Sequence, residues 1–222
     1  MTKDPTFQLV PASTAVDAGT LRRLAVALAI AGAELALAWG LALPSVGVGE
    51  SIPDGSIGIT LVESFDIASA AGYHTLSASG EPSGFVLANR STPPYVWQRA
   101  VSHEFFETMV DPRCNEWAQD AVGRLWALEV CDPVQDDWYA IDLDDGGEPI
   151  TISNWCMPAW FTDPVPGHRI DRMGLLTAPW TLRPGGYAAT ITHGVVTPMP
   201  GPQTRSATAR WSRRIDPTRW QS

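Results

Sequence analysis

The stretch between residues 24 and 43 restricts the fold most strongly, because its mostly Ala and Leu side chains must be covered either by protein or by lipid. Glu34 lies in the middle of this stretch, and a spanning helix would have to bury that carboxylate in hydrocarbon. The leucines and alanines recur at steps of three and four residues, which is typical of one apolar helix face. We therefore predict a helix over residues 16–38, ended by Gly40, that packs inside a protein domain and does not cross a membrane.

Composition and charge narrow the class of protein. The chain has 222 residues, of which 45% are hydrophobic, so it can bury a sizeable core. A net charge of −9 argues against a general nucleic-acid binder. Three cysteines without a C-x-x-C pair give neither a disulfide framework nor a thiolate zinc site. The polar, mixed N-terminus lacks the pattern of a signal peptide, so none is expected.

Local patterns predict an α+β fold. A second helix is expected over residues 96–110, ended by Asp111-Pro112. We predict two main helices packed on a small mixed sheet, with a loop-rich C-terminal part. The expected strands are residues 57–63, residues 84–88, a hairpin of residues 125–131 and 138–143 with "DPVQD" as its turn, residues 150–155, and a strand after "LRPGG"; residues 68–83 are expected to form a connection or an irregular strand. The expected organisation is an arm at 1–15, a domain at 16–200 and a basic Arg/Trp tail at 201–222.

The segment His103-Glu104-Phe105-Phe106-Glu107 carries the clearest chemistry, because it differs from the zinc-peptidase pattern H-E-x-x-H only in its last residue. Positions i and i+4 share one helix face, so His103 and Glu107 can reach one ion together. Imidazole nitrogen and carboxylate oxygen both bind zinc, at roughly 2.0–2.2 Å. Glu104 can then take a proton from water as a general base. An ordinary helix with two surface glutamates and a capping histidine is the alternative.

A third ligand is expected from the segment "LEVCDP". Glu129 is the first candidate and Asp132 the alternative, and either would leave one position of the metal open to water. Cys131 lies between them and is interpreted as a buried core residue. His74, in "AGYHT", is a candidate for binding substrate or stabilising an oxyanion, with a structural hydrogen-bonding role as the alternative.

The order of several motifs resembles a group of uncharacterised phage and prophage proteins with a zincin-like plan. The motifs are "SHEFFETMVDP", "LEVCDP", "ISNW-CMPAWF" and "LRPGGY", preceded by "WG" and "GYH". The resemblance implies a phage-encoded metal site for zinc or another divalent cation, with His103 and Glu107 as ligands, Glu104 as general base, and Glu129 or Asp132 as the third ligand. Glu107 in place of histidine makes this site harder and more anionic than that of zinc peptidases.

Two functions follow from the resemblance as expectations. One is a metal-dependent peptidase or related hydrolase acting on a protein or peptide. The other is a structural virion component, of the capsid or tail, that keeps a zincin-like fold without catalysis. Arg and Trp favour protein interfaces, so the C-terminal tail is expected to bind other virion proteins. The expected location is the virion or the host cytoplasm.

Overall fold

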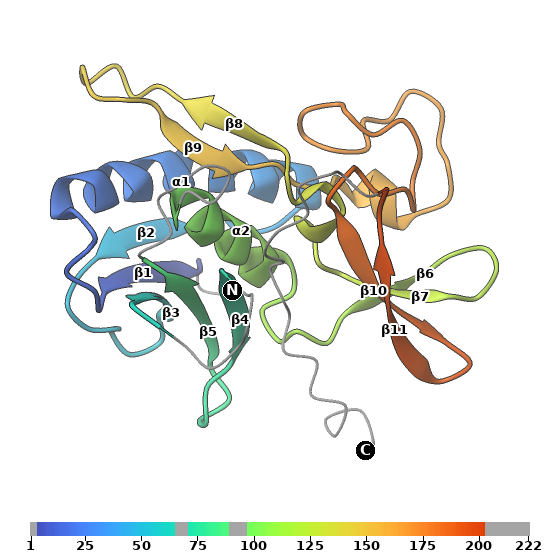
Figure 1. Ribbon diagram of the computed structural model, residues 1–222, viewed down its shortest axis with the longest axis horizontal. Helices are drawn as coiled ribbons and strands as arrows, with labels where there is room; N and C mark the ends of the chain where they lie inside the picture. Colours follow the sequence, from blue (N-terminus) through green and yellow to red (C-terminus); the bar gives the residue numbers. More distant parts are fainter. Residues whose placement is uncertain (1–3, 65–70, 89–96, 203–222) are drawn as a thin grey trace.

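The computed structural model describes residues 4–64, 71–88 and 97–202, and it shows an α+β protein (Figure 1). Within these residues two α-helices pack against a mixed sheet and a two-stranded sheet, and a further antiparallel sheet lies at one end of the molecule. The expected α+β class with two main helices is therefore confirmed. The Arg/Trp tail lies outside the described residues, apart from its first two positions.

The mixed sheet has the strand order β2-β1-β3-β5-β4. All neighbours run parallel except β4, which pairs antiparallel with β5 at the edge. Parallel neighbours require a crossover connection, and the long first helix supplies it between β1 and β2. The strands are β1 (Thr6–Pro11), β2 (Ser45–Val48), β3 (Ile57–Val62), β4 (Gly72–Leu76) and β5 (Pro82–Leu87).

Helix α1 (Ala18–Trp39) begins and ends where the sequence predicts. The Asp17 side chain accepts a hydrogen bond from the amide of Thr20, and Gly40 takes the left-handed conformation at the other end with a φ of 66°. The leucines of the predicted face, from Leu21 to Leu35, are fully buried. Neither helix in the described part of the chain is long and apolar enough to span a membrane.

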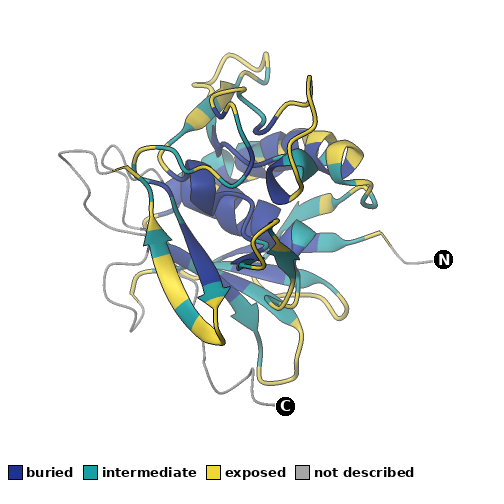
Figure 2. Ribbon diagram, turned by 90° about the vertical axis from the view of Figure 1, so that its right-hand side faces the viewer, coloured by how far each residue is buried: buried dark blue, intermediate teal, exposed yellow. Residues whose placement is uncertain are grey.

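Helix α2 (Trp97–Val110) lies at the centre of the molecule and is buried along almost its whole length (Figure 2). It packs on β4 and β5 of the mixed sheet and on β9 of the two-stranded sheet. It also crosses α1 closely, since a Cβ added at Gly32 would come within 2.9 Å of the Phe105 ring. A helix so enclosed must place its polar side chains against one another or against other buried polar groups.

The described residues after α2 form two antiparallel sheets and two short 3₁₀ helices. The order β11-β10-β7-β6 describes one sheet, and β8 pairs with β9 in the other. Trp126, Trp160 and Trp180 stack edge-on or tilted with ring centroids 5.5–5.6 Å apart, so tryptophan anchors this end. The elements are β6 (Trp117–Gln119), β7 (Leu125–Ala127), η1 (Asp132–Val134), β8 (Trp138–Ile141), β9 (Ile150–Ser153), η2 (Pro158–Phe161), β10 (Tyr187–Thr192) and β11 (Val195–Pro200).

The hairpin predicted from residues 125–131 and 138–143 is wrong. Strand β7 pairs with β6 and β10, while β8 pairs with β9. The predicted turn "DPVQD" instead contains η1, because Pro133 fixes the φ angle of the first helical turn. The chain between β7 and β8 thus folds inward and carries Glu129 and Asp132 into the interior.

Two other segments are more regular than the sequence predicts. Residues 1–15 are expected to form an arm, whereas Thr6–Pro11 are β1, paired on both sides within the mixed sheet. The alternation of Phe7 and Leu9, both fully buried, is the signal for this strand. The expected irregular connection contains β4, whose edge position brings His74 beside α2.

Candidate metal centre

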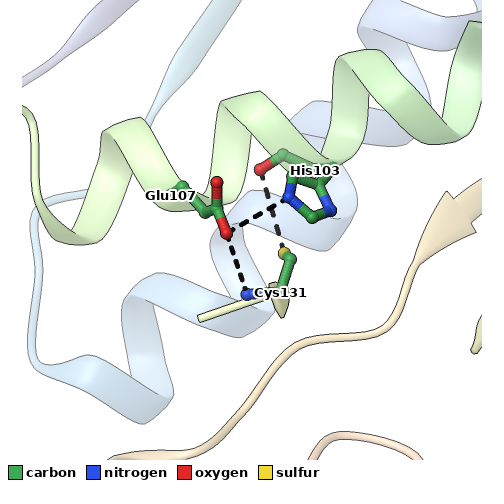
Figure 3. A group of neighbouring side chains, drawn as sticks. All are labelled: His103, Glu107 and Cys131. Carbon is green, nitrogen blue, oxygen red and sulfur yellow. Dashed lines mark hydrogen bonds and ion pairs between the residues drawn. The ribbon is translucent and has the colours of Figure 1, made fainter. Parts of the chain in front are cut away.

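Helix α2 presents His103 and Glu107 on the same side, one turn apart (Figure 3). His103 Nε2 lies 3.2 Å from Glu107 Oε1. Both side chains are at most 4% exposed. The segment after β7 faces them, and the amide of Cys131 donates a hydrogen bond of 3.3 Å to the same Glu107 oxygen. The pattern H-E-x-x-E thus forms a buried pair on one helix face, and the alternative of surface glutamates does not hold.

Asp132 and Glu129 approach this pair from the loop and 3₁₀ turn that follow β7. Asp132 Oδ1 lies 3.3 Å from His103 Nε2. Glu129 lies on the other side of the cluster, with Oε2 at 3.4 Å from His74 Nε2. Both acidic side chains are 2–3% exposed. The structure therefore brings both candidates for the third ligand into the same interior region, although they contact different histidines.

His74 joins the cluster from the edge strand β4. Its Nδ1 lies 3.2 Å from Glu104 Oε2 and 3.4 Å from Glu107 Oε2. The side chain is 2% exposed, so it faces carboxylates and not bulk solvent. Gly72, two residues earlier on the same face of β4, leaves room for Glu104, because a Cβ there would lie 2.7 Å from Glu104 Oε1.

Among the residues that the structure describes, two groups of three side chains lie close enough together to hold a metal ion. One consists of His103, Glu107 and Cys131, and the other of His74, Glu107 and Glu129. Within each group the candidate ligand atoms all lie within 4.8 Å of one another. All of these residues are buried, in contrast to the exposed acidic clusters that surface loops often carry. The cluster could therefore bind a divalent cation.

The separations between the nitrogen and oxygen atoms are close to those expected between the ligands of one tetrahedral metal ion. Two ligands bound tetrahedrally at roughly 2.0–2.2 Å are separated by about 3.4 Å. Charge-assisted hydrogen bonds between nitrogen and oxygen are shorter, about 2.7–2.9 Å. The five histidine–carboxylate distances here are 3.2–3.4 Å.

Without a cation, the cluster shifts the affinity of its histidines for protons. Burial alone would lower the pKa of His103, but the negative charge of Glu107 and a hydrogen bond with Asp132 outweigh it and raise this pKa well above the usual range. The pKa of His74 is raised in the same way, because the charge of Glu129 outweighs burial. Both imidazoles therefore take up protons when no metal balances the carboxylates.

The carboxyl groups divide according to their surroundings. Burial raises the pKa of Glu104 despite a hydrogen bond from His74, and it raises the pKa of Asp132 well above its usual range. Burial would raise the pKa of Glu107 as well, but the positive charge of His103 lowers it below the usual value. Of these three carboxyl groups, Glu107 stays ionised most readily, and Glu104 is the one suited to exchange a proton.

Sequence reasoning missed three contributors. Cys131 is fully buried as expected of a core residue, yet its thiol lies 3.8 Å from the carbonyl oxygen of His103 and within ligand range of Glu107. Cys114 hydrogen-bonds with His74, and Tyr187 hydrogen-bonds with Asp132. Tyr187 belongs to the "PGGY" motif, which was the available signal, but nothing in the sequence places it beside Asp132.

Asp111 and Asp145 form contacts other than those of the cluster. The Asp111 carboxylate accepts hydrogen bonds of 3.0 Å from the amides of Asn115 and Glu116, so it caps the turn after α2. Asp145, in the hairpin between β8 and β9, pairs with Arg23 of α1.

Comparison with known proteins gives no family assignment. No protein-family model, curated protein or solved structure matches the chain. The function must therefore be argued from the geometry of the buried cluster itself.

Proposed function

We propose that this protein is a metal-dependent hydrolase of the zincin-like type, encoded by a phage, that binds zinc in the buried cluster and cleaves a peptide or related amide bond. One observation carries the proposal: His103, Glu104 and Glu107 on one buried helix meet His74, Glu129 and Asp132 from two other elements at distances of 3.2–3.4 Å. Nitrogen and oxygen donors in this proportion suit zinc and other borderline or hard divalent ions.

The arrangement of elements supports the zincin-like comparison. After β1, a long helix precedes the other four strands of the mixed sheet; its edge strand β4 runs antiparallel to its neighbour, and α2 lies beside that edge. The segment after β7 then supplies the downstream acidic groups. This order of helix, edge strand, site helix and downstream ligand is the plan that the sequence motifs suggest.

The residues of the cluster have different roles in the proposed reaction. A bound divalent ion acts as a Lewis acid that makes water more acidic. His103 and Glu107 hold the ion, and the backbone amide of Cys131 fixes the Glu107 carboxylate in place. Glu104 accepts the proton of the attacking water and passes it to the leaving amine. Its raised pKa favours this exchange near neutral pH, and Nδ1 of His74, 3.2 Å away, orients its carboxylate.

The substitution Glu104→Gln tests the catalytic role. Zinc-loaded wild-type protein is expected to cleave a fluorescein-labelled casein substrate. The variant should keep its zinc, measured by inductively coupled plasma mass spectrometry, and lose about 10²–10⁴-fold in rate. Glu116→Gln, which changes an exposed glutamate just beyond α2, serves as the matched control. Wild-type turnover in the Glu104 variant would contradict the assigned role.

A structural role in a virion is the second candidate, and the burial of the cluster favours it. The side chains are at most 4% exposed, so a bound ion would also tie α2 to β4 and to the segment after β7. In that case metal removal lowers the melting temperature while no substrate is cleaved with or without metal. Mass spectrometry of purified phage particles should then find many copies of the chain in each particle, whereas its absence from particles would exclude this role.

A further inference from the structure

Glu107 belongs to both groups of candidate ligands, and its two oxygens face different histidines. Oε1 lies 3.2 Å from His103 Nε2, while Oε2 lies 3.4 Å from His74 Nδ1. A carboxylate that binds one ion through one oxygen leaves its second oxygen free to serve another ion. The orientation of Glu107 is therefore that of a bridge between two neighbouring sites.

The other side chains separate into two sets around this bridge. Cys131 lies with His103 in one group of close ligand atoms, and Glu129 lies with His74 in the other. Among the described residues, no group of mutually close ligand atoms contains both histidines. Since the ligands of one tetrahedral ion at roughly 2.0–2.2 Å lie about 3.4 Å from each other, the two sets suit two neighbouring ions better than a single ion.

The charge of the cluster also exceeds what one divalent ion can balance. Four carboxyl groups are buried together, at 2–3% exposure. Their two histidine partners are neutral when they bind a metal. One divalent ion would leave two negative charges uncompensated in a region with little access to water, which is costly. Two divalent ions balance all four carboxylates (Glu104, Glu107, Glu129 and Asp132), and a single negative charge remains when the Cys131 thiolate also binds.

We propose that the cluster is a dinuclear metal site in which Glu107 bridges two divalent ions. The first ion binds His103, Glu107 Oε1 and Cys131. The second binds His74, Glu107 Oε2 and Glu129. This inference rests on the proposed metal-dependent function and specifies its site as a two-metal centre, in which the ions lie about 3.5–4 Å apart and clamp the attacking and leaving groups.

Zinc stoichiometry tests the proposal directly. Metal-free protein is titrated with zinc sulfate and examined by native mass spectrometry, with circular dichroism as a check on folding. Wild-type protein is expected to bind two zinc ions per chain, and His74→Ala is expected to bind one. His168→Ala, which changes an exposed histidine outside the cluster, should still bind two. If His74→Ala does not fold, the milder change Glu129→Gln replaces it, with the same expected loss of one ion.

The possible results separate the two proposals. One zinc ion in the wild type, unchanged in the His74 and Glu129 variants, overturns the dinuclear site and leaves a single-metal hydrolase standing. No bound zinc overturns the metal-dependent function itself. Cobalt loading adds a spectroscopic readout, because a thiolate ligand gives a charge-transfer band in the near ultraviolet. This band should be present in the wild type and absent in Cys131→Ser, and a wild type without it would remove Cys131 from the ligand set.

Discussion

At the scale of single residues, the chemistry of the site depends on how fully the charged groups are enclosed. Glu104 and His103 are each 2% exposed and stand next to one another on α2, so both must find partners inside the protein. The partners come from β4 and from the segment after β7, which are distant in the sequence. The function of the helix therefore depends on residues that do not belong to its motif.

Gly72 is expected to be necessary for the position of Glu104. In Gly72→Ala the new Cβ would lie 2.7 Å from Glu104 Oε1, so the carboxylate must move away from His74. We expect a loss of about 1–3 kcal/mol in the free energy of unfolding, which is usual for overpacking, together with reduced hydrolysis. Chemical denaturation and the casein assay measure the two effects. Thr75→Ala on the same strand is the control, and equal behaviour of the two variants would contradict this role.

The three cysteines should differ in their reactivity toward alkylation. Burial raises the pKa of the Cys131 and Cys156 thiols well above the usual value, whereas Cys114 is partly exposed. Because the thiolate is the reactive form, iodoacetamide at about pH 8 is expected to modify Cys114 first in the native protein. Peptide mapping by mass spectrometry gives the order of modification. Modification of Cys131 at the same rate as Cys114 would show that the interior of the site is open to solvent.

At the scale of elements, the crossing of α1 over α2 fixes the position of the site helix. Gly32 allows this approach, since an added Cβ would meet both Pro44 and the Phe105 ring at 2.7–2.9 Å. Gly→Ala inside a helix normally stabilises it by about 0.5–1 kcal/mol. We expect the opposite sign for Gly32→Ala, a loss of about 1–3 kcal/mol, because the helices must separate. Urea denaturation provides the measurement, and a gain in stability would contradict the close crossing.

The sequence predicts elements well where one local pattern decides them. The caps Asp17 and Gly40 and the end of α2 before Asp111-Pro112 are visible as residue types at fixed positions. Strand pairing is not visible in this way, because it depends on contacts between distant segments. The predicted hairpin failed for this reason, since Pro133 starts a 3₁₀ turn that turns the chain inward before β8 begins.

The candidate site could be predicted from the sequence only where helical periodicity decides the position of a side chain. His103, Glu104 and Glu107 share a helix, and helical periodicity alone places the two ligands on one face. The contacts of Glu129 with His74 and of Asp132 with His103 follow from the path of the loop after β7, for which no periodicity exists. His74 is predicted from the sequence to bind substrate, to stabilise an oxyanion or to make structural hydrogen bonds. Its contacts with three glutamates depend on β4 forming the sheet edge beside α2.

At the scale of the whole molecule, a bound metal should join the mixed sheet, α2 and the loop after β7 into one cooperative unit. In the metal-free protein the raised pKa values of His74 and His103 mean that their protonated forms stabilise the fold below about pH 6.5. This contribution is lost as the pH rises through the folded-state pKa values. The raised pKa values of Glu104 and Asp132 mean that their protonated forms also stabilise the fold at low pH. This contribution is likewise lost as the pH rises through their folded-state pKa values.

The stabilisation by zinc is therefore expected to grow with pH. Metal binding requires neutral imidazoles and ionised carboxyl groups, so it competes with protons at low pH. The difference in melting temperature between zinc-loaded and chelator-treated protein should be small near about pH 5.5 and larger near about pH 8. Differential scanning calorimetry at matched ionic strength measures both states. A difference that shrinks with rising pH would mean that zinc binds outside this cluster.

The central claim is that side chains distant in the sequence converge on a divalent cation. The most direct test is X-ray diffraction from crystals of the zinc-loaded protein, with data collected on both sides of the zinc absorption edge. We expect anomalous density within about 2.0–2.2 Å of His103 Nε2 and a Glu107 oxygen. Density found only outside this cluster, or a clear map with none and with His103 joined directly to its carboxylates by short hydrogen bonds, would contradict it.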